Sequence, residues 1–161
     1  EIGVRLVGSE MCIRDSYKTQ GKTLWDAMLD LYEKYGYYKD DVKAITLKGI
    51  EGLAKIQEIM TTLRDNTPAQ IGEHKVLKAR DYKKDTITDL ETGAVTPTGL
   101  PNSNVLYYEL PDAAWVCFRP SGTEPKLKFY YGVKADSMEA ADAKAAELGA
   151  AVMAIVEPML G

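Results

Sequence analysis

The sequence predicts an α+β domain, with an antiparallel sheet of about four strands covered by two helices on one face and a further helix before it. Apolar residues recur at helical spacing in three stretches, and they alternate in stretches that flank short turns. Helices and strands are grouped along the chain rather than strictly alternating, and that order is typical of an α+β domain. The 161 residues suffice for one domain with a part of a second.

The start of the chain differs from the rest. Residues 1–16 show no clean helical or alternating period, and the string from Val4 to Ser16, VRLVGSEMCIRDS, resembles translated sequencing-adapter sequence. We therefore expect a non-native segment there, with the native sequence beginning near Tyr17. Tight packing of residues 1–16 into the core would contradict this expectation.

The first native helix is predicted over residues 23–35. Thr23 is suited to cap it, with Asp26 as a capping-box partner of the weaker kind. Its apolar residues share one face: Leu24, Met28, Leu31 and Tyr35. Gly36 suits the left-handed position that follows a helix.

The middle of the chain is predicted to form a strand, a helix and a second strand. The strand covers residues 42–47, and the helix covers 50–64 before Thr67-Pro68 stops it. The second strand covers 76–82. Residues 85–104 are rich in Thr, Asp, Gly, Pro and Asn, so we expect turns and a long loop there.

Three strands and a helix complete the prediction. Strands over 105–110 and 114–119 are joined by Pro111-Asp112-Ala113. A strand over 127–134 alternates strongly, with its apolar side chains on one face: Leu127, Phe129, Tyr131 and Val133. Asp136 or Ser137 then caps a final helix, whose apolar residues recur at steps of three and four until Pro158 ends it.

Composition excludes several classes of protein. The net charge of -4 argues against a nucleic-acid-binding protein, and no apolar run is long enough to cross a bilayer. No signal peptide is recognisable. Cys12 and Cys117 lie far apart without metal-ligand spacing, which is typical of reduced thiols. We therefore expect a cytoplasmic protein.

The segment from Arg119 to Lys126, RPSGTEPK, has the side chains of a phosphate-binding loop. The fork of Arg119 can hold two phosphate oxygens, and Ser121 and Thr123 add hydroxyl donors. Gly122 lets backbone N–H groups approach an anion closely. Two further groups are possible support, Lys126 and Glu124.

Lys128 extends this basic cluster along the following strand, where it falls on the face opposite Leu127 and Phe129. The loop contains no cysteine nucleophile, no nearby histidine and no run of carboxylates, so we assign no catalytic residue and no metal ligand to the chain. The alternative is an ordinary hairpin loop whose Ser, Gly, Thr and Pro residues serve the turn alone. His74 is expected at the surface or in a turn, and Cys117 in semi-core packing.

The loop with its following strand, RPSGTEPKLKFY, resembles the phosphate loop of the C-terminal domain of the α-D-phosphohexomutases. Two upstream stretches share the likeness: TGLPNSNVLYYELPDAAWVCF, and KGIEGLAKIQEIMTTLR in the style of bacterial α-phosphoglucomutases. The resemblance implies a TATA-binding-protein-like fold and a phosphate held by Arg119, Ser121, Gly122, Thr123 and Lys128. It also implies the domains: a linker helix over 17–40 and the phosphate-binding domain over 41–161.

The resemblance further implies an isomerase whose chemistry lies elsewhere. In that family a phosphoserine on another domain exchanges a phosphoryl group with the sugar phosphate through a 1,6-bisphosphate, with Mg²⁺ in support. The serine, metal and sugar loops of the family are absent from this sequence. We therefore expect an inactive fragment of a phosphoglucomutase, whose partners are glucose 1-phosphate or glucose 6-phosphate and the upstream domains. The alternatives are a phosphomannomutase or phosphopentomutase fragment, or a non-catalytic sugar-phosphate or anion-binding module.

Overall fold

The computed structural model describes residues 2–160, with side chains described from residue 8 onward. The chain forms two compact units, Glu1–Tyr37 and Tyr38–Gly161. The first unit holds two helices, α1 (Ile2–Thr19) and α2 (Leu24–Tyr35). The sequence showed no helical period over residues 1–16, yet the structure continues α1 through most of them. The described side chains over 8–16 are exposed, and whether this segment is native stays a prediction.

Helix α2 begins as the sequence predicts. The Thr23 hydroxyl accepts from the Asp26 backbone N–H at 3.1 Å, while the Asp26 carboxylate accepts from the Thr23 N–H at 2.8 Å, which completes the capping box. Gly36 follows at φ 98° and ψ 163°, a positive-φ conformation outside the left-handed helical region that was expected. The predicted apolar face is exposed, with Leu24 at 50% and Tyr35 at 54%.

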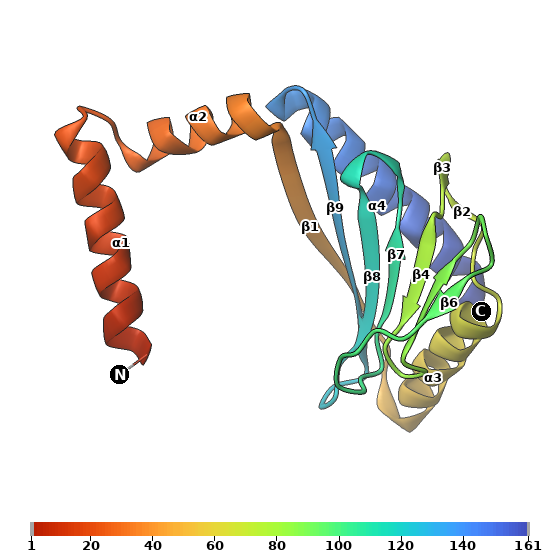
Figure 1. Cartoon of the computed structure of the whole chain (residues 1–161). Helices are drawn as coiled ribbons and strands as arrows, with labels where there is room; N and C mark the ends of the chain where they lie inside the picture. Colours follow the sequence, from red (N-terminus) through yellow and green to blue (C-terminus); the bar gives the residue numbers. More distant parts are fainter. Residues whose placement is uncertain (1, 161) are drawn as a thin grey trace. The chain divides into compact units, whose positions relative to one another are not determined.

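The second unit has two layers, a β-sheet and a pair of helices packed on one of its faces (Figure 1). The sheet has seven strands rather than about four, in the order β1-β9-β8-β7-β4-β5-β6. Their bounds are β1 Tyr37–Thr46, β4 Lys78–Asp81, β5 Thr86–Asp89, β6 Val95–Thr96, β7 Leu106–Glu109, β8 Trp115–Pro120 and β9 Lys126–Ala135. A separate hairpin joins β2 (Gln70–Ile71) to β3 (His74–Lys75).

Two of the extra strands lie where a loop was predicted. Within residues 85–104, β5 and β6 pair with each other, and β5 pairs with β4. Their sequence gave no sign of strands because β5 is half-buried throughout and β6 is exposed, so neither alternates in burial. Residues 97–105 do form the expected loop. Strand β1 begins at Tyr37, five positions before the predicted start. The sequence did not indicate its first half because those residues are mostly exposed and do not alternate in burial.

Helices α3 (Gly49–Asp65) and α4 (Met138–Leu160) cover one face of the sheet, as predicted (Figure 1). Ser137 caps α4, since its hydroxyl accepts from the Ala140 N–H at 3.1 Å. Pro158 does not end the helix, which continues to Leu160. A proline so near the end removes a hydrogen bond only from the last turn, where its cost is small.

The core lies between this sheet face and the two helices. Tyr108, Phe118 and Phe129 are fully buried and stack edge to face across β7, β8 and β9, with ring centroids 5.7 and 5.4 Å apart. The Tyr108 hydroxyl donates to the Leu63 carbonyl of α3 at 3.2 Å, so its burial leaves no polar atom unsatisfied. The alternation predicted for β9 is confirmed, because Leu127, Phe129, Tyr131 and Val133 are all buried. The residues between them must therefore point to the opposite face.

Helix α4 approaches β9 closely at Gly149. A Cβ there would fall on the Tyr131 side chain, with 2.8 Å to Cζ. The Tyr131 hydroxyl in turn donates to the Asp41 carboxylate of β1 at 3.3 Å. The Tyr131 side chain thus links β9 to both β1 and α4, and β9 carries Lys128 and Tyr130 of the site described next.

Candidate functional site

The sheet face away from α3 and α4 is here called the open face. Its residues are set by the strand register, which places Lys128 of β9 opposite Arg119 of β8. The next row along the strands pairs Tyr130 with Cys117, and Cys117 with Tyr107. Side chains in one row stand side by side. The register thus brings Arg119, Lys128 and Tyr130 together at the β8–β9 end of this face.

A tight loop joins β8 to β9 above these side chains. The Ser121 N–H donates to the Lys126 carbonyl at 2.8 Å and closes the loop. The Ser121 hydroxyl oxygen accepts from the N–H groups of Thr123 and Glu124 at 3.4 and 3.3 Å. Because this oxygen serves as an acceptor inside the loop, its own hydrogen is free to be donated outward.

The loop and the strands enclose a hollow of ≈ 230 Å³. Five of the residues that line it were predicted from the sequence: Arg119, Ser121, Gly122, Thr123 and Lys128. Two more, Pro120 and Tyr130, were not assigned to the site from the sequence. The structure therefore brings all five predicted phosphate-binding residues to one cavity. Tyr130 could have been found from the alternation of β9, which puts it on the same face as Lys128.

Two cations of the hollow, Arg119 and Lys128, have no side-chain partner among the described residues. Among the residues that the structure describes, no hydrogen bond or ion pair joins Arg119 or Lys128 to another side chain. By contrast, Lys126 pairs with Glu124 at 3.1 Å, and neither lines the hollow. Lys126 and Glu124, expected as possible support, thus neutralise each other. The hollow itself keeps two uncompensated positive charges, which match the charge of a phosphate dianion.

The backbone contributes fewer donors than the sequence indicated. Three of the four N–H groups from Ser121 to Glu124 are already bonded within the loop, two of them to the Ser121 hydroxyl. Only the Gly122 N–H has no partner among the described residues. The predicted series of free N–H groups is therefore reduced to one, because Ser121 turns its side chain back onto the loop. The remaining donors must come from side chains.

A second hollow of ≈ 350 Å³ lies beside the first on the open face. It is lined by Tyr107 of β7 and Cys117 of β8, and by residues outside the strands: Tyr82, Leu100, Pro101, Ser103 and Val105. Burial raises the pKa of the Cys117 thiol to about 11, with Arg119 opposing that rise in part. A thiol with so high a pKa is a poor nucleophile at neutral pH, so the expected packing role suits it.

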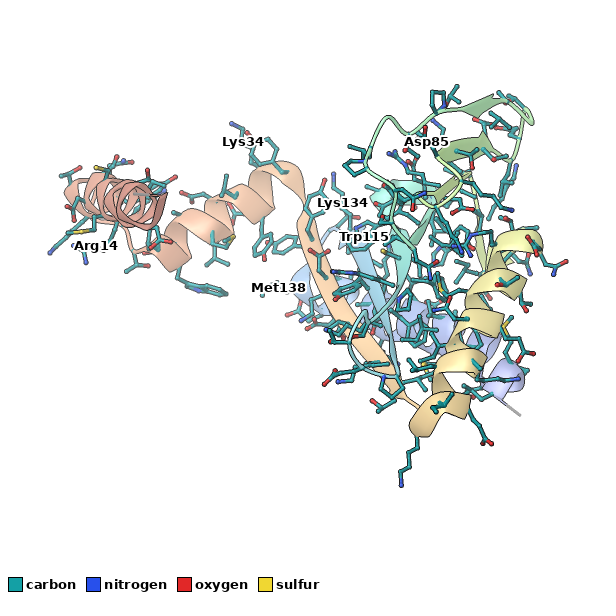
Figure 2. The ribbon with its side chains drawn as sticks, turned by 90° about the horizontal axis from the view of Figure 1, so that it is seen from below. Arg14, Lys34, Asp85, Trp115, Lys134 and Met138 are labelled. Carbon is teal, nitrogen blue, oxygen red and sulfur yellow. The ribbon has the colours of Figure 1, made fainter. Side chains whose placement is uncertain are left out.

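The long loop over this second hollow is held at both ends. Arg64 of α3 donates to the Asp81 carboxylate at 2.9 Å and to the Asn104 side chain at 2.8 Å. Asp85, labelled in Figure 2, accepts from the backbone N–H groups of Thr98 and Gly99 at 3.0 and 3.1 Å. The Thr98 hydroxyl and these N–H groups lower the pKa of Asp85. These contacts hold the loop in place beside the hollow that Arg119 and Lys128 line.

Other candidates do not join the site. His74 lies in β3, half-buried and outside the lining of the hollow. Within residues 2–160, the structure brings together no group of three His, Cys, Asp or Glu side chains that could hold a metal ion. No helix in that part of the chain is long and apolar enough to span a membrane.

Comparison with known proteins finds phosphoglucomutases. The chain is 38% identical over 122 residues to a Staphylococcus aureus phosphoglucomutase and 34% identical over 122 residues to that of Staphylococcus epidermidis. Each match covers 76% of this chain, and the chain spans about 22% of the length of these relatives. No protein-family model matches it.

A solved structure supports the fold. The exocytosis-sensitive phosphoprotein pp63/parafusin of Paramecium, a phosphoglucomutase in its open form, superposes with a TM-score of 0.50. That match has 17% identity and covers 84% of this chain and 23% of that one. The likeness predicted from the loop and its flanking stretches is confirmed for a domain-sized part of these enzymes.

Proposed function

We propose, from the likeness of this chain to one domain of the phosphoglucomutases, that it holds the phosphate group of a sugar phosphate within such an enzyme. The observation that carries the proposal is the pair of unpaired cations, Arg119 and Lys128, facing one hollow with the Ser121 and Thr123 hydroxyls. A planar guanidinium and a lysine ammonium hold a phosphate by complementary means, one by paired hydrogen bonds and one by charge. In an ordinary hairpin, two cations that line one hollow without a carboxylate would only repel each other, so a bound anion explains their placement.

The same geometry limits what the domain does. Hydroxyls, one free N–H and two cations can bind and orient an anion, but among the described residues no histidine, cysteine or carboxylate lines the hollow to activate a hydroxyl or serve as a general base. In our proposal, other parts of the enzyme donate and receive the phosphoryl group, and the Mg²⁺ that supports such transfer is held by them as well. The domain acts in the cytoplasm on glucose 1-phosphate and glucose 6-phosphate.

A rigid cradle suits this role for a physical reason. A mutase must bind a phosphate while the sugar presents either of its two ends, so contacts to the phosphate must not depend on the sugar. The residues of the hollow lie on two neighbouring strands and a closed loop, with Pro120 at its start. A site that is fixed before binding loses little conformational entropy when the anion arrives.

Titration of the chain with inorganic phosphate, followed residue by residue by NMR, tests the proposal. We expect the largest shifts at the Gly122 backbone N–H and the Arg119 side chain, and small shifts at β2 and β3. Saturating shifts confined to other residues, or no shifts at millimolar phosphate, would refute it. In a companion assay, the chain incubated with glucose 1-phosphate and a sugar bisphosphate should form no glucose 6-phosphate, and robust turnover would disprove the division of labour.

A further inference from the structure

We infer that Tyr130 is a further phosphate-binding residue, whose hydroxyl donates a hydrogen bond to the anion from the strand side of the hollow. The inference rests on the proposed function and adds to it a neutral donor that the loop motif does not contain. Its motivation is the position of Tyr130 in the register and the lack of any other partner for its hydroxyl.

The position follows from the sheet. Tyr130 stands two residues after Lys128 on β9, so both side chains point to the open face, and the buried Phe129 between them points to the core. The register places Tyr130 beside Cys117, one row from the facing pair Arg119 and Lys128. Tyr130 lines the same hollow as these two cations.

The hydroxyl of Tyr130 differs from those of two buried tyrosines of the same sheet, Tyr131 and Tyr108. The Tyr131 hydroxyl donates to Asp41, and the Tyr108 hydroxyl donates to the Leu63 carbonyl. Among the described residues, nothing accepts from the Tyr130 hydroxyl. A half-buried phenol that lines a hollow with two cations can donate its hydrogen to an anion that enters the hollow.

The Tyr130 hydroxyl also adds a hydrogen-bond donor where the loop backbone supplies few. The phosphate group of a sugar phosphate has three terminal oxygens, each able to accept more than one hydrogen bond, whereas the described loop backbone offers one free N–H. The loop donors approach from one side of the hollow, and Lys128 and Tyr130 come from the strand side. Because a phenol is neutral, its bond adds orientation to the cradle without changing the charge balance.

The matched variants are Tyr130→Phe and Tyr107→Phe, since each removes one hydroxyl from the open face and keeps its ring. Tyr107 lines the second hollow instead, where its ring stacks on Trp115 with centroids 5.4 Å apart. Binding of inorganic phosphate is measured by calorimetry at several salt concentrations, with Arg119→Ala included. We expect Tyr130→Phe to weaken phosphate binding about tenfold, as for loss of a hydrogen bond to a charged group. Tyr107→Phe should bind as the parent does.

The salt dependence separates a neutral donor from a charge. Removal of Arg119 should flatten the dependence of affinity on salt, whereas Tyr130→Phe should leave it unchanged, because only charges are screened. Parent-like binding by Tyr130→Phe, with binding lost in Arg119→Ala, would overturn this inference and leave the proposed function standing. An effect of Tyr130→Phe on glucose 1-phosphate but not on inorganic phosphate would also overturn it. If Arg119→Ala binds phosphate as tightly as the parent, both the inference about Tyr130 and the proposed function are refuted.

Discussion

The two lysines of the loop region should differ sharply in their effect on phosphate binding. Lys128 lines the hollow without a partner, whereas Lys126 is neutralised by Glu124. A unit charge about 4 Å from a phosphate is worth about 4 kcal/mol at an effective dielectric constant near 20. Lys128 is only half-buried, and solvent reduces such contacts to about 1–2 kcal/mol. We therefore expect Lys128→Ala to weaken phosphate binding about five- to thirtyfold.

The control must remove Lys126 together with Glu124. Loss of Lys126 alone would leave the Glu124 carboxylate unpaired near the anion and repel it. The double variant Lys126→Gln with Glu124→Gln removes equal and opposite charges. Calorimetry should therefore find that its affinity for phosphate differs from that of the parent by less than about twofold. Strong weakening in the double variant, with none in Lys128→Ala, would show that we have assigned the charges of the cradle wrongly.

Three further predictions concern stability and reactivity. Gly149→Ala should gain about 1 kcal/mol of helix propensity but lose more by overpacking against Tyr131, so urea unfolding should show a net loss of about 1 kcal/mol; a more stable variant would contradict the close contact. Arg64→Met leaves the buried Asp81 carboxylate without its cation, and should lower the free energy of unfolding by about 3 kcal/mol; a change below 1 kcal/mol would mean that the pair is solvated. Site-resolved alkylation of Cys117 should be slow at pH 7.5 and accelerate as pH rises towards its pKa of about 11, since only the thiolate reacts; fast alkylation at neutral pH would rule out the raised pKa.

Strong periodicity was the most reliable guide to the fold. Helix α3 and the buried face of β9 follow from spacing alone, because one side of each packs on the core. The first half of strand β1 and the β5–β6 pair escaped prediction for the opposite reason. They form the two edges of the sheet, where both faces of much of the backbone are exposed or half-buried and no alternation results.

The site was predictable in its side chains and less so in its backbone. Arg119, Ser121 and Lys128 could be assigned from donor chemistry and strand parity. The engagement of the Thr123 N–H by Ser121 could not, because it depends on the rotamer of one serine. Nor does sequence alone separate Lys126 from Lys128, which share a strand face. Only the position of Glu124 shows which of the two is neutralised.

The central claim is that Arg119 anchors a phosphate in this domain, and Arg119→Ala tests it most directly. Lys78→Ala is the matched control, because it removes one positive charge from the same sheet, on β4, outside the lining of the hollow. Loss of the bidentate contact should cost about 2–4 kcal/mol of phosphate binding, roughly thirty- to a thousandfold by calorimetry. Lys78→Ala should bind phosphate nearly as the parent does. Equal affinities in the parent, Arg119→Ala and Lys78→Ala would contradict the claim.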